Sequence, residues 1–344
     1  MSKDNETIHL ALDGPLPPEE PQGFAPDQMI TCDECLRANP PTRMSCLYCS
    51  AALALTESSS KLRRPSLRQP EKHEPGFNCI FIPQNRQAFS QLSLEEASRL
   101  LKLSNESLEC IIDKNVPMPL ARTASREESQ LVVERLKELG VDSLTLTDQE
   151  LGLEQKFLIR PRSLQIEEGS FSLNYSGGTN IVSIDWTDLC LIVSGRLVLK
   201  SVEVKESKSR GSENELLETS QFSSDEAVFD LYSFSQPHTW RVGANSFDFS
   251  CLQDRKTLIA GDNLNRLREL LISKANNIKV DDSFNSLSVV LQPVWPAEQA
   301  THSTGWRRER PGKFSIGATT LNSNETQFTR YSRLRRYFLL HGSN

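Results

Sequence analysis

The feature that most constrains this chain is a set of four cysteines near its N-terminus, Cys32, Cys35, Cys46 and Cys49. They form two Cys-x-x-Cys pairs separated by ten residues. Each pair can bend into a tight turn that brings two thiolates to one metal ion, and two pairs complete the tetrahedral set that Zn²⁺ prefers. The spacing therefore predicts one structural zinc ion per chain, with a redox dithiol or a cluster as the alternatives.

The segment CDECLRANPPTRMSCLYC resembles the short zinc ribbons common in bacterial proteins, including its Asn39–Pro41 stretch. It is also similar to the RanBP2-type finger, which has an asparagine after its second cysteine. The finger's usual tryptophan is Ile30 here, which weakens any implication of RNA recognition. The glycines that usually follow the second and fourth ribbon cysteines are Leu36 and Ser50. The resemblance implies a bacterial protein in which the metal holds a small module together.

The other four cysteines stand alone within apolar segments, and they are Cys79, Cys110, Cys190 and Cys251. Lone thiols of this kind are typical of a reducing compartment, where they act as small hydrophobic residues. No apolar run is long enough to span a bilayer, and the first thirty residues are acidic and proline-rich, unlike a secretory signal. We therefore expect a cytoplasmic protein without a transmembrane segment.

Composition divides the first half of the chain into four parts. Residues 1–29 lack periodicity and predict a disordered leader, residues 30–53 hold the zinc ribbon, and the Ser- and Pro-rich residues 54–76 predict a linker. A compact module follows over residues 77–151. A chain of 344 residues has room for two or three such compact units.

Residues 77–151 predict the element order β-α-α-β-α-β. FNCIFIP, PMPLART and VDSLTLTD are typical of short strands. Each predicted helix begins at a polar N-cap, namely Ser93, Ser104 or Asn105, and Ser125. This order, and the segment from Leu120 to Thr147, resemble the C-terminal domain of the ribosomal stalk protein and the related Clp-protease adaptor fold. Both families dock other proteins, which implies a partner-binding role, although the stalk family's lysine-rich helix is absent.

Residues 156–296 predict an antiparallel, barrel-like β domain closed by a C-terminal helix. Its short β-rich runs include SLQIEEG, FSLNYSGG, IVSIDW, HTWRV and SFDFSCL, and NLNRLRELLISKA is an amphipathic helix. This order is similar to that of pleckstrin-homology-like domains. The hydrophilic residues 207–225 predict a flexible insertion. Taken together, the chain is predicted to be an α+β multidomain protein.

Residues 297–344 predict a basic tail that ends in a helix. The chain carries a net charge of −6, but from Thr301 onward eight Lys or Arg residues face two acids. The arginines that could contact nucleic acid or a partner are Arg307, Arg308, Arg310, Arg330, Arg333, Arg335 and Arg336. Alternatively, Tyr331, Leu334 and Phe338 form one apolar face by which the last helix docks on the body.

No catalytic constellation is evident in the sequence. His238 is the only histidine in a predicted strand region, and no phosphate-binding glycine loop occurs. The pattern favours a non-catalytic adaptor or regulatory scaffold that acts through protein–protein contacts. The alternatives are a nucleic-acid-associated factor that uses the zinc ribbon and the basic tail, and an enzyme built on the β-rich domain. No small-molecule substrate is inferred.

Overall fold

A computed structural model describes this chain over most of its length. The described residues are 23–54, 56, 59, 62–63, 65–68, 70, 74–83, 90–153, 157–175, 180–209, 215–275, 277–310 and 313–342. For residues 180, 205–209, 215–218, 304–310 and 313–317, only the backbone is described. Residues 1–22 of the predicted leader lie outside these ranges. The chain divides into two compact units, Met1–Arg64 (unit 1) and Pro65–Asn344 (unit 2).

Unit 1 contains short elements of regular structure among its described residues. It has a 3₁₀ turn η1 (Pro26–Gln28) and two short antiparallel strands, β1 (Ile30–Thr31) and β2 (Ala38–Asn39). Its buried apolar core consists of Cys32, Cys46 and Leu53. Arg63, in the predicted linker, is fully buried and donates to the carbonyls of Leu53 and Ala54 at 3.0 and 2.8 Å. Part of the predicted linker therefore folds onto the cysteine module.

The first part of unit 2 has the predicted order of elements. They are β3 (Phe77–Phe81), α2 (Gln91–Leu101), α3 (Asn105–Asp113), β4 (Met118–Thr123), α4 (Arg126–Glu138) and β5 (Ser143–Thr147). The strands form one sheet in the order β4-β3-β5, with both neighbours antiparallel to β3. Ser104 and Ser125 cap α3 and α4 as predicted. Helix α2 begins earlier than predicted, because Ser90 rather than Ser93 accepts the capping hydrogen bond.

A second group of elements builds a β-rich core. They are β6 (Leu158–Ile159), β7 (Ser163–Ile166), β8 (Ser170–Tyr175), β9 (Asn180–Asp185), β10 (Leu189–Ser209), β11 (Glu215–Ser233), β12 (Thr239–Gly243), η3 (Phe249–Arg255) and α5 (Ala260–Lys274). Strands β7, β8 and β9 form a three-stranded antiparallel sheet. Their apolar residues share a core with those of β10–β12 and α5, around the buried Trp240. SFDFSCL, which was expected to be a strand, contributes to the 3₁₀ helix η3 instead.

The C-terminal region differs from the predicted tail. It contains β13 (Lys279–Asp281), α6 (Phe284–Leu291), β14 (Glu298–Arg310), β15 (Lys313–Ser323) and α7 (Glu325–His341). Strand β15 pairs with β10 from Leu199 to Ser209, so the last hairpin extends the β-rich sheet to the order β14-β15-β10-β11-β12-β6. Residues 297–344 are therefore an integral part of unit 2, and no domain boundary lies at Pro296.

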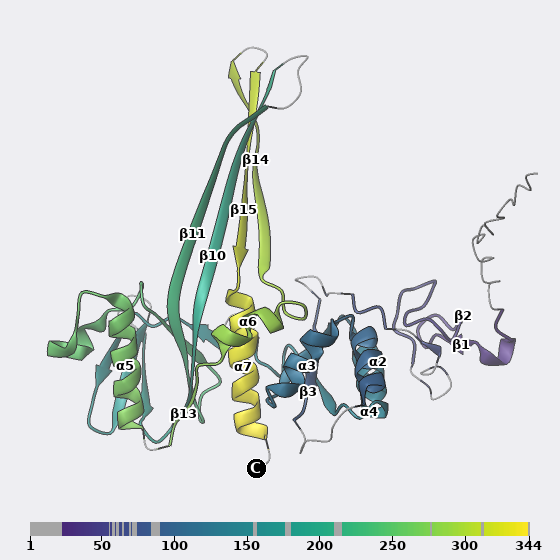
Figure 1. Cartoon of the computed structure of the whole chain (residues 1–344), viewed down its shortest axis with the longest axis horizontal. Coiled ribbons are helices and arrows are strands. Elements are labelled where there is room, and N and C mark those ends of the chain that lie inside the picture. Colours follow the sequence, from purple (N-terminus) through teal and green to yellow (C-terminus); the bar gives the residue numbers. More distant parts are fainter. Residues whose placement is uncertain are drawn as a thin grey trace, which may run out of the picture. The chain divides into compact units, whose positions relative to one another are not determined.

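Strands β14, β15, β10 and β11 continue beyond the helices as a four-stranded ribbon, hereafter the ribbon (Figure 1). A flexible insertion was predicted over residues 207–225. Its described residues, 207–209 and 215–225, instead belong to strands β10 and β11. Exposed residues such as Phe222 and Lys200 show why the sequence misleads. A ribbon that buries neither face has no reason to alternate apolar and polar residues.

The module over residues 77–151 shares its hydrophobic core with the C-terminal elements. Buried residues of β3, α2 and α4 lie in one cluster with those of α6 and α7, including Phe284 and Phe328. In the same region, the indole N–H of Trp295 donates to Oδ1 of Asn78 at 2.9 Å. The module and the β-rich elements thus belong to one compact unit.

None of the described helices combines the length and the apolar character needed to cross a membrane.

Candidate metal centre

The four predicted cysteines lie on two backbone turns with the same hydrogen bonds. In the first turn, the N–H of Cys32 donates to the carbonyl of Arg37 at 3.0 Å, and the N–H of Leu36 donates to that of Cys32 at 2.8 Å. In the second turn, the N–H of Cys46 donates to the carbonyl of Ala51 at 2.8 Å, and the N–H of Ser50 donates to the carbonyl of Cys46 at 3.1 Å. Two equivalent knuckles therefore present the thiols.

Each knuckle places one residue in the left-handed region of backbone conformation. Leu36 has φ 58° and Ser50 has φ 61°. These are the two positions at which the sequence departs from the glycines usual in zinc ribbons. A residue with a Cβ is strained in this conformation, whereas glycine adopts it without a steric penalty. The knuckle geometry is thus kept despite the substitutions, at a conformational cost.

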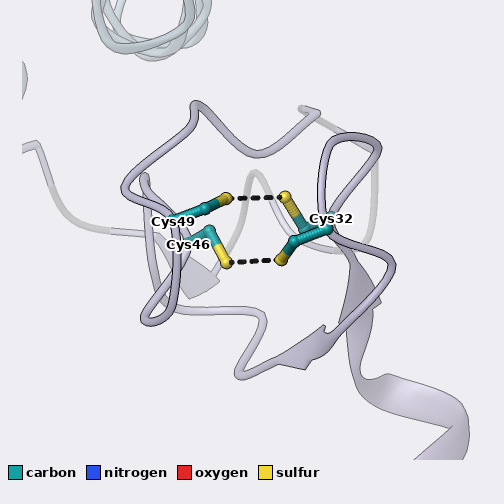
Figure 2. A group of neighbouring side chains, drawn as sticks. Cys32, Cys46 and Cys49 are labelled. Atoms are coloured by element: carbon teal, nitrogen blue, oxygen red, sulfur yellow. Dashed lines mark hydrogen bonds between the residues drawn. The ribbon is translucent and has the colours of Figure 1, made fainter.

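The four sulfur atoms converge on one point. All four lie within 4.8 Å of one another, and Figure 2 shows Cys32 facing Cys46 and Cys49 across a small gap. The Sγ atoms of Cys32 and Cys49 are 3.6 Å apart, and those of Cys35 and Cys46 are 3.5 Å apart. These separations are far longer than a disulfide bond of about 2.0 Å. They fit a tetrahedral ion with sulfur ligands at about 2.3 Å.

Asn39 connects the two knuckles from a fully buried position. Its amide N–H₂ donates to the carbonyl of Arg37 at 2.8 Å and contacts Sγ of Cys46 at 3.4 Å. Its amide oxygen accepts from the N–H of Leu47 at 2.8 Å. Asn39 thus fixes the position of one ligand relative to the other knuckle, as outer-shell groups of metal sites commonly do.

The Cys46 thiol is surrounded by donors. Burial acts to raise its pKa, but the backbone N–H groups of Cys49 and Tyr48 and the Asn39 amide together lower the pKa of Cys46 to about 6. Donors directed at sulfur stabilise the thiolate, which is the form that binds a metal ion. The surroundings of Cys46 therefore favour its role as a ligand.

The arginines predicted as contact residues fall into two groups. Arg307, Arg308 and Arg310 belong to β14, and their side chains lie outside the described part of the structure. The others, Arg330, Arg333, Arg335 and Arg336, belong to α7.

Three of the arginines on α7 bind groups within unit 2. Arg333 donates to the carbonyls of Pro237 and Phe157, and Arg336 donates to those of Pro237 and Gln236. Arg335 pairs with Asp281 at 2.5 Å. Burial lowers the pKa of Arg330 to about 10. The guanidinium groups of Arg333, Arg335 and Arg336 hold α7 against the fold.

The sequence did not reveal a fully buried ion pair between β11 and β12. Asp230 and Arg241 occupy directly opposite positions in the two strands. Nε and Nη2 of Arg241 bind the two carboxylate oxygens of Asp230 at 2.8 and 2.9 Å, and neither side chain is exposed. The pairing of Asp230 with Arg241 could not be predicted from the sequence, because it depends on the register of two strands whose connecting turn has no recognisable type.

Among the described residues, no hydrogen bond connects His238 to a nucleophile or an acid. Its ring lies 6.0 Å from that of Phe157 and 6.2 Å from that of Trp240. Partial burial, followed by the charges of Arg333 and Arg336, lowers its pKa. A shallow pocket of about 100 Å³ lies elsewhere, lined by residues that include Leu101, Leu120 and Val294.

Comparison of this chain with protein-family models, with curated proteins and with solved structures yields no match.

Proposed function

We propose that this chain is a non-catalytic adaptor whose N-terminal unit is held together by one structural Zn²⁺ bound to Cys32, Cys35, Cys46 and Cys49. Four thiolates at tetrahedral spacing are the donor set that zinc takes in structural sites, and they leave no position for substrate. The core of unit 1 is otherwise confined to a few residues. The metal thus supplies the stability that so small a unit lacks.

The observation that carries the adaptor proposal is an apolar surface on the knuckles. Leu36, Leu47 and Tyr48 are 77%, 52% and 56% exposed, and the guanidinium of Arg37 lies 4.7 Å from the centre of the Tyr48 ring. These four residues are the knuckle patch. Tyrosine and arginine are among the residues enriched in protein-binding sites, and the exposed leucines of the knuckles add apolar area that a partner could cover.

The architecture of unit 2 supports the same proposal. The three-stranded sheet β7-β8-β9, strands β10–β12 and helix α5 enclose one core, an arrangement consistent with a pleckstrin-homology-like domain. The sheet order β4-β3-β5 with its three helices is likewise consistent with a stalk-like docking module. Both folds are widely used for binding, although a fold alone does not define a function.

Replacing Leu47 and Tyr48 together by serine should strongly reduce the amount of partner protein that the chain captures, without loss of zinc. The change removes apolar contact area from residues that are not ligands, so binding should weaken by about tenfold or more. Affinity capture with mass spectrometry on the full chain measures the effect. Leu92→Ser, which alters an exposed leucine of α2, is the matched control and should retain the partner. Equal capture by both variants would refute the proposal.

Replacing Leu36 by glycine should raise the affinity for zinc. Glycine relieves the strain of φ 58° at this position, which is worth about 1 kcal/mol, or roughly a fivefold change in affinity. Leu36→Ala is the control, because it also removes the exposed side chain but keeps the Cβ. Competition with a chromophoric chelator measures both variants. If alanine and glycine act alike, the strain argument is wrong.

The nucleic-acid alternative now depends mainly on Arg307, Arg308 and Arg310, because the guanidinium groups of α7 bind elsewhere in unit 2. Nucleic-acid binding that weakens steeply with salt and is lost when these three residues become alanine would favour it over the adaptor proposal.

A further inference from the structure

The two outer strands of the ribbon have unpaired edges. In the described part of the chain, no strand pairs with the outer edge of β14, and β12 covers β11 only from Val228 to Leu231. From Glu215 to Glu226, the outer edge of β11 therefore has no neighbouring strand among the described residues. A long strand edge of this kind presents N–H and C=O groups that can pair with a further strand.

The directions of the strands allow one ribbon to continue into another. Neighbours in the order β14-β15-β10-β11 are antiparallel throughout, so β14 and β11 run in opposite directions. If two copies lie side by side with their ribbons pointing the same way, β14 of one meets β11 of the other in antiparallel orientation. The pattern within the ribbon then extends without interruption across the junction.

The two edges also share one irregularity; a second shift on β14, between Arg308 and Arg310, lies beyond the last paired residue of β11. On β14 the register with β15 shifts between Ser303 and Trp306, which leaves one extra residue on β14. On β11 the register with β10 shifts between Glu218 and Leu216, which leaves one extra residue on β11. Both bulges occur at the same level of the ribbon. The two extra residues therefore lie opposite each other, and β14 of one copy can pair with β11 of another in one continuous register.

In that register, complementary residues occupy the two ends of three rows, where a row is the set of residues that lie opposite one another across the four strands. The row through Ser315 and Ser207 begins at Arg307 on β14 and ends at Glu215 on β11. Its two ends thus carry opposite charges, which attract when they are placed opposite each other across strands. Like charges at both edges would instead repel a second copy, as is common where a protein protects its sheet edges.

Two further rows end in apolar residues on both edges. One begins at Trp306 and ends at Leu216, and another begins at Ala300 and ends at Phe222. Phe222 is 77% exposed, so its ring is free to be covered by a further strand. A neighbouring β14 edge would cover it and place the small Ala300 opposite.

We infer that the ribbon is a self-assembly surface, in which β14 of one copy pairs with β11 of a second copy. The contact joins two different surfaces, so each added copy still offers one free edge. Such heterologous association grows beyond a dimer and produces a ring where the rotation closes, or a filament where it does not.

Sedimentation velocity of the full chain over a range of concentrations tests the inference. The wild type should form species larger than a dimer. Arg307→Glu and Glu215→Arg should each weaken association by about tenfold or more, because each places like charges in one row. Mixing the two variants should restore it, since every junction then pairs opposite charges again. Lys200→Glu reverses an exposed charge on the central strand β10 and should leave association unchanged.

A wild-type protein that stays monomeric at all concentrations would overturn the inference. A species that stops at the dimer, or association that both charge variants leave unchanged, would also overturn it, because another surface would then be responsible. Circular dichroism spectra that match the wild type ensure that the variants report on association and not on folding.

Discussion

Replacing Cys46 and Cys49 by serine should eliminate zinc binding and unfold unit 1 while unit 2 remains folded. Both ligands come from the second knuckle, and the buried core of unit 1 consists of two of the four cysteines and Leu53. Structural zinc contributes about 10–16 kcal/mol to the folding of small modules of this kind, far more than such a core can supply. Elemental analysis should give one zinc ion per wild-type chain and none for the variant.

Limited proteolysis distinguishes the two units in the same sample. Arg37 and Arg43 lie between the second and third cysteines, and trypsin should cleave there rapidly in the variant or after chelation. Helices and strands of unit 2 should resist. Cys110→Ser is the matched control, because it changes a lone cysteine of α3 that lies outside the cluster. Zinc retained by the Cys46 and Cys49 variant would disprove the ligand assignment.

The sequence predicted the cysteine site because its information is local. Two knuckles of fixed length determine where four thiols point, and the hydrogen bonds of the knuckles are nearly the same for any intervening residues. The helix caps Ser104 and Ser125 were predictable for the same reason, since each acts within three residues. The role of Asn39 in orienting Cys46 could not be predicted, because the contact between them depends on how the second knuckle folds back.

The C-terminal half could not be predicted because its contacts are distant in sequence. Strand β15 pairs with β10 more than a hundred residues earlier. Both faces of the ribbon carry exposed side chains among the described residues, such as Lys200 and Phe222, so its polar strands resemble loops in the sequence. The arginines of α7 resembled a nucleic-acid-binding surface. Only the fold brings the carbonyls of Gln236 and Pro237 to Arg333 and Arg336. A cluster of arginines in a sequence therefore indicates a binding surface only where the fold leaves their side chains exposed.

The buried pair of Asp230 and Arg241 joins the last helix to the β-rich sheet. Besides its two bonds to Asp230, the Arg241 guanidinium donates to Glu325 at 2.9 Å and to Thr329 at 3.0 Å, both on α7. Its Cζ also lies 4.7 Å from the centre of the Phe328 ring. One guanidinium thus connects β11, β12 and α7, and nearly all of its donors have partners.

Replacing Arg241 by methionine should therefore destabilise unit 2 by about 3–5 kcal/mol, because Asp230 is left buried without its counter-ion. For a unit of this size, we expect the melting temperature to fall by about 10 °C, as measured by circular dichroism. Arg196→Met is the matched control, since it breaks the exposed pair of Arg196 with Asp225 and should cost under about 1 kcal/mol. Adding Asp230→Leu to Arg241→Met should recover much of the loss, because apolar residues can replace a buried pair. If Arg241→Met costs no more than Arg196→Met, the buried pair does not hold α7 in place.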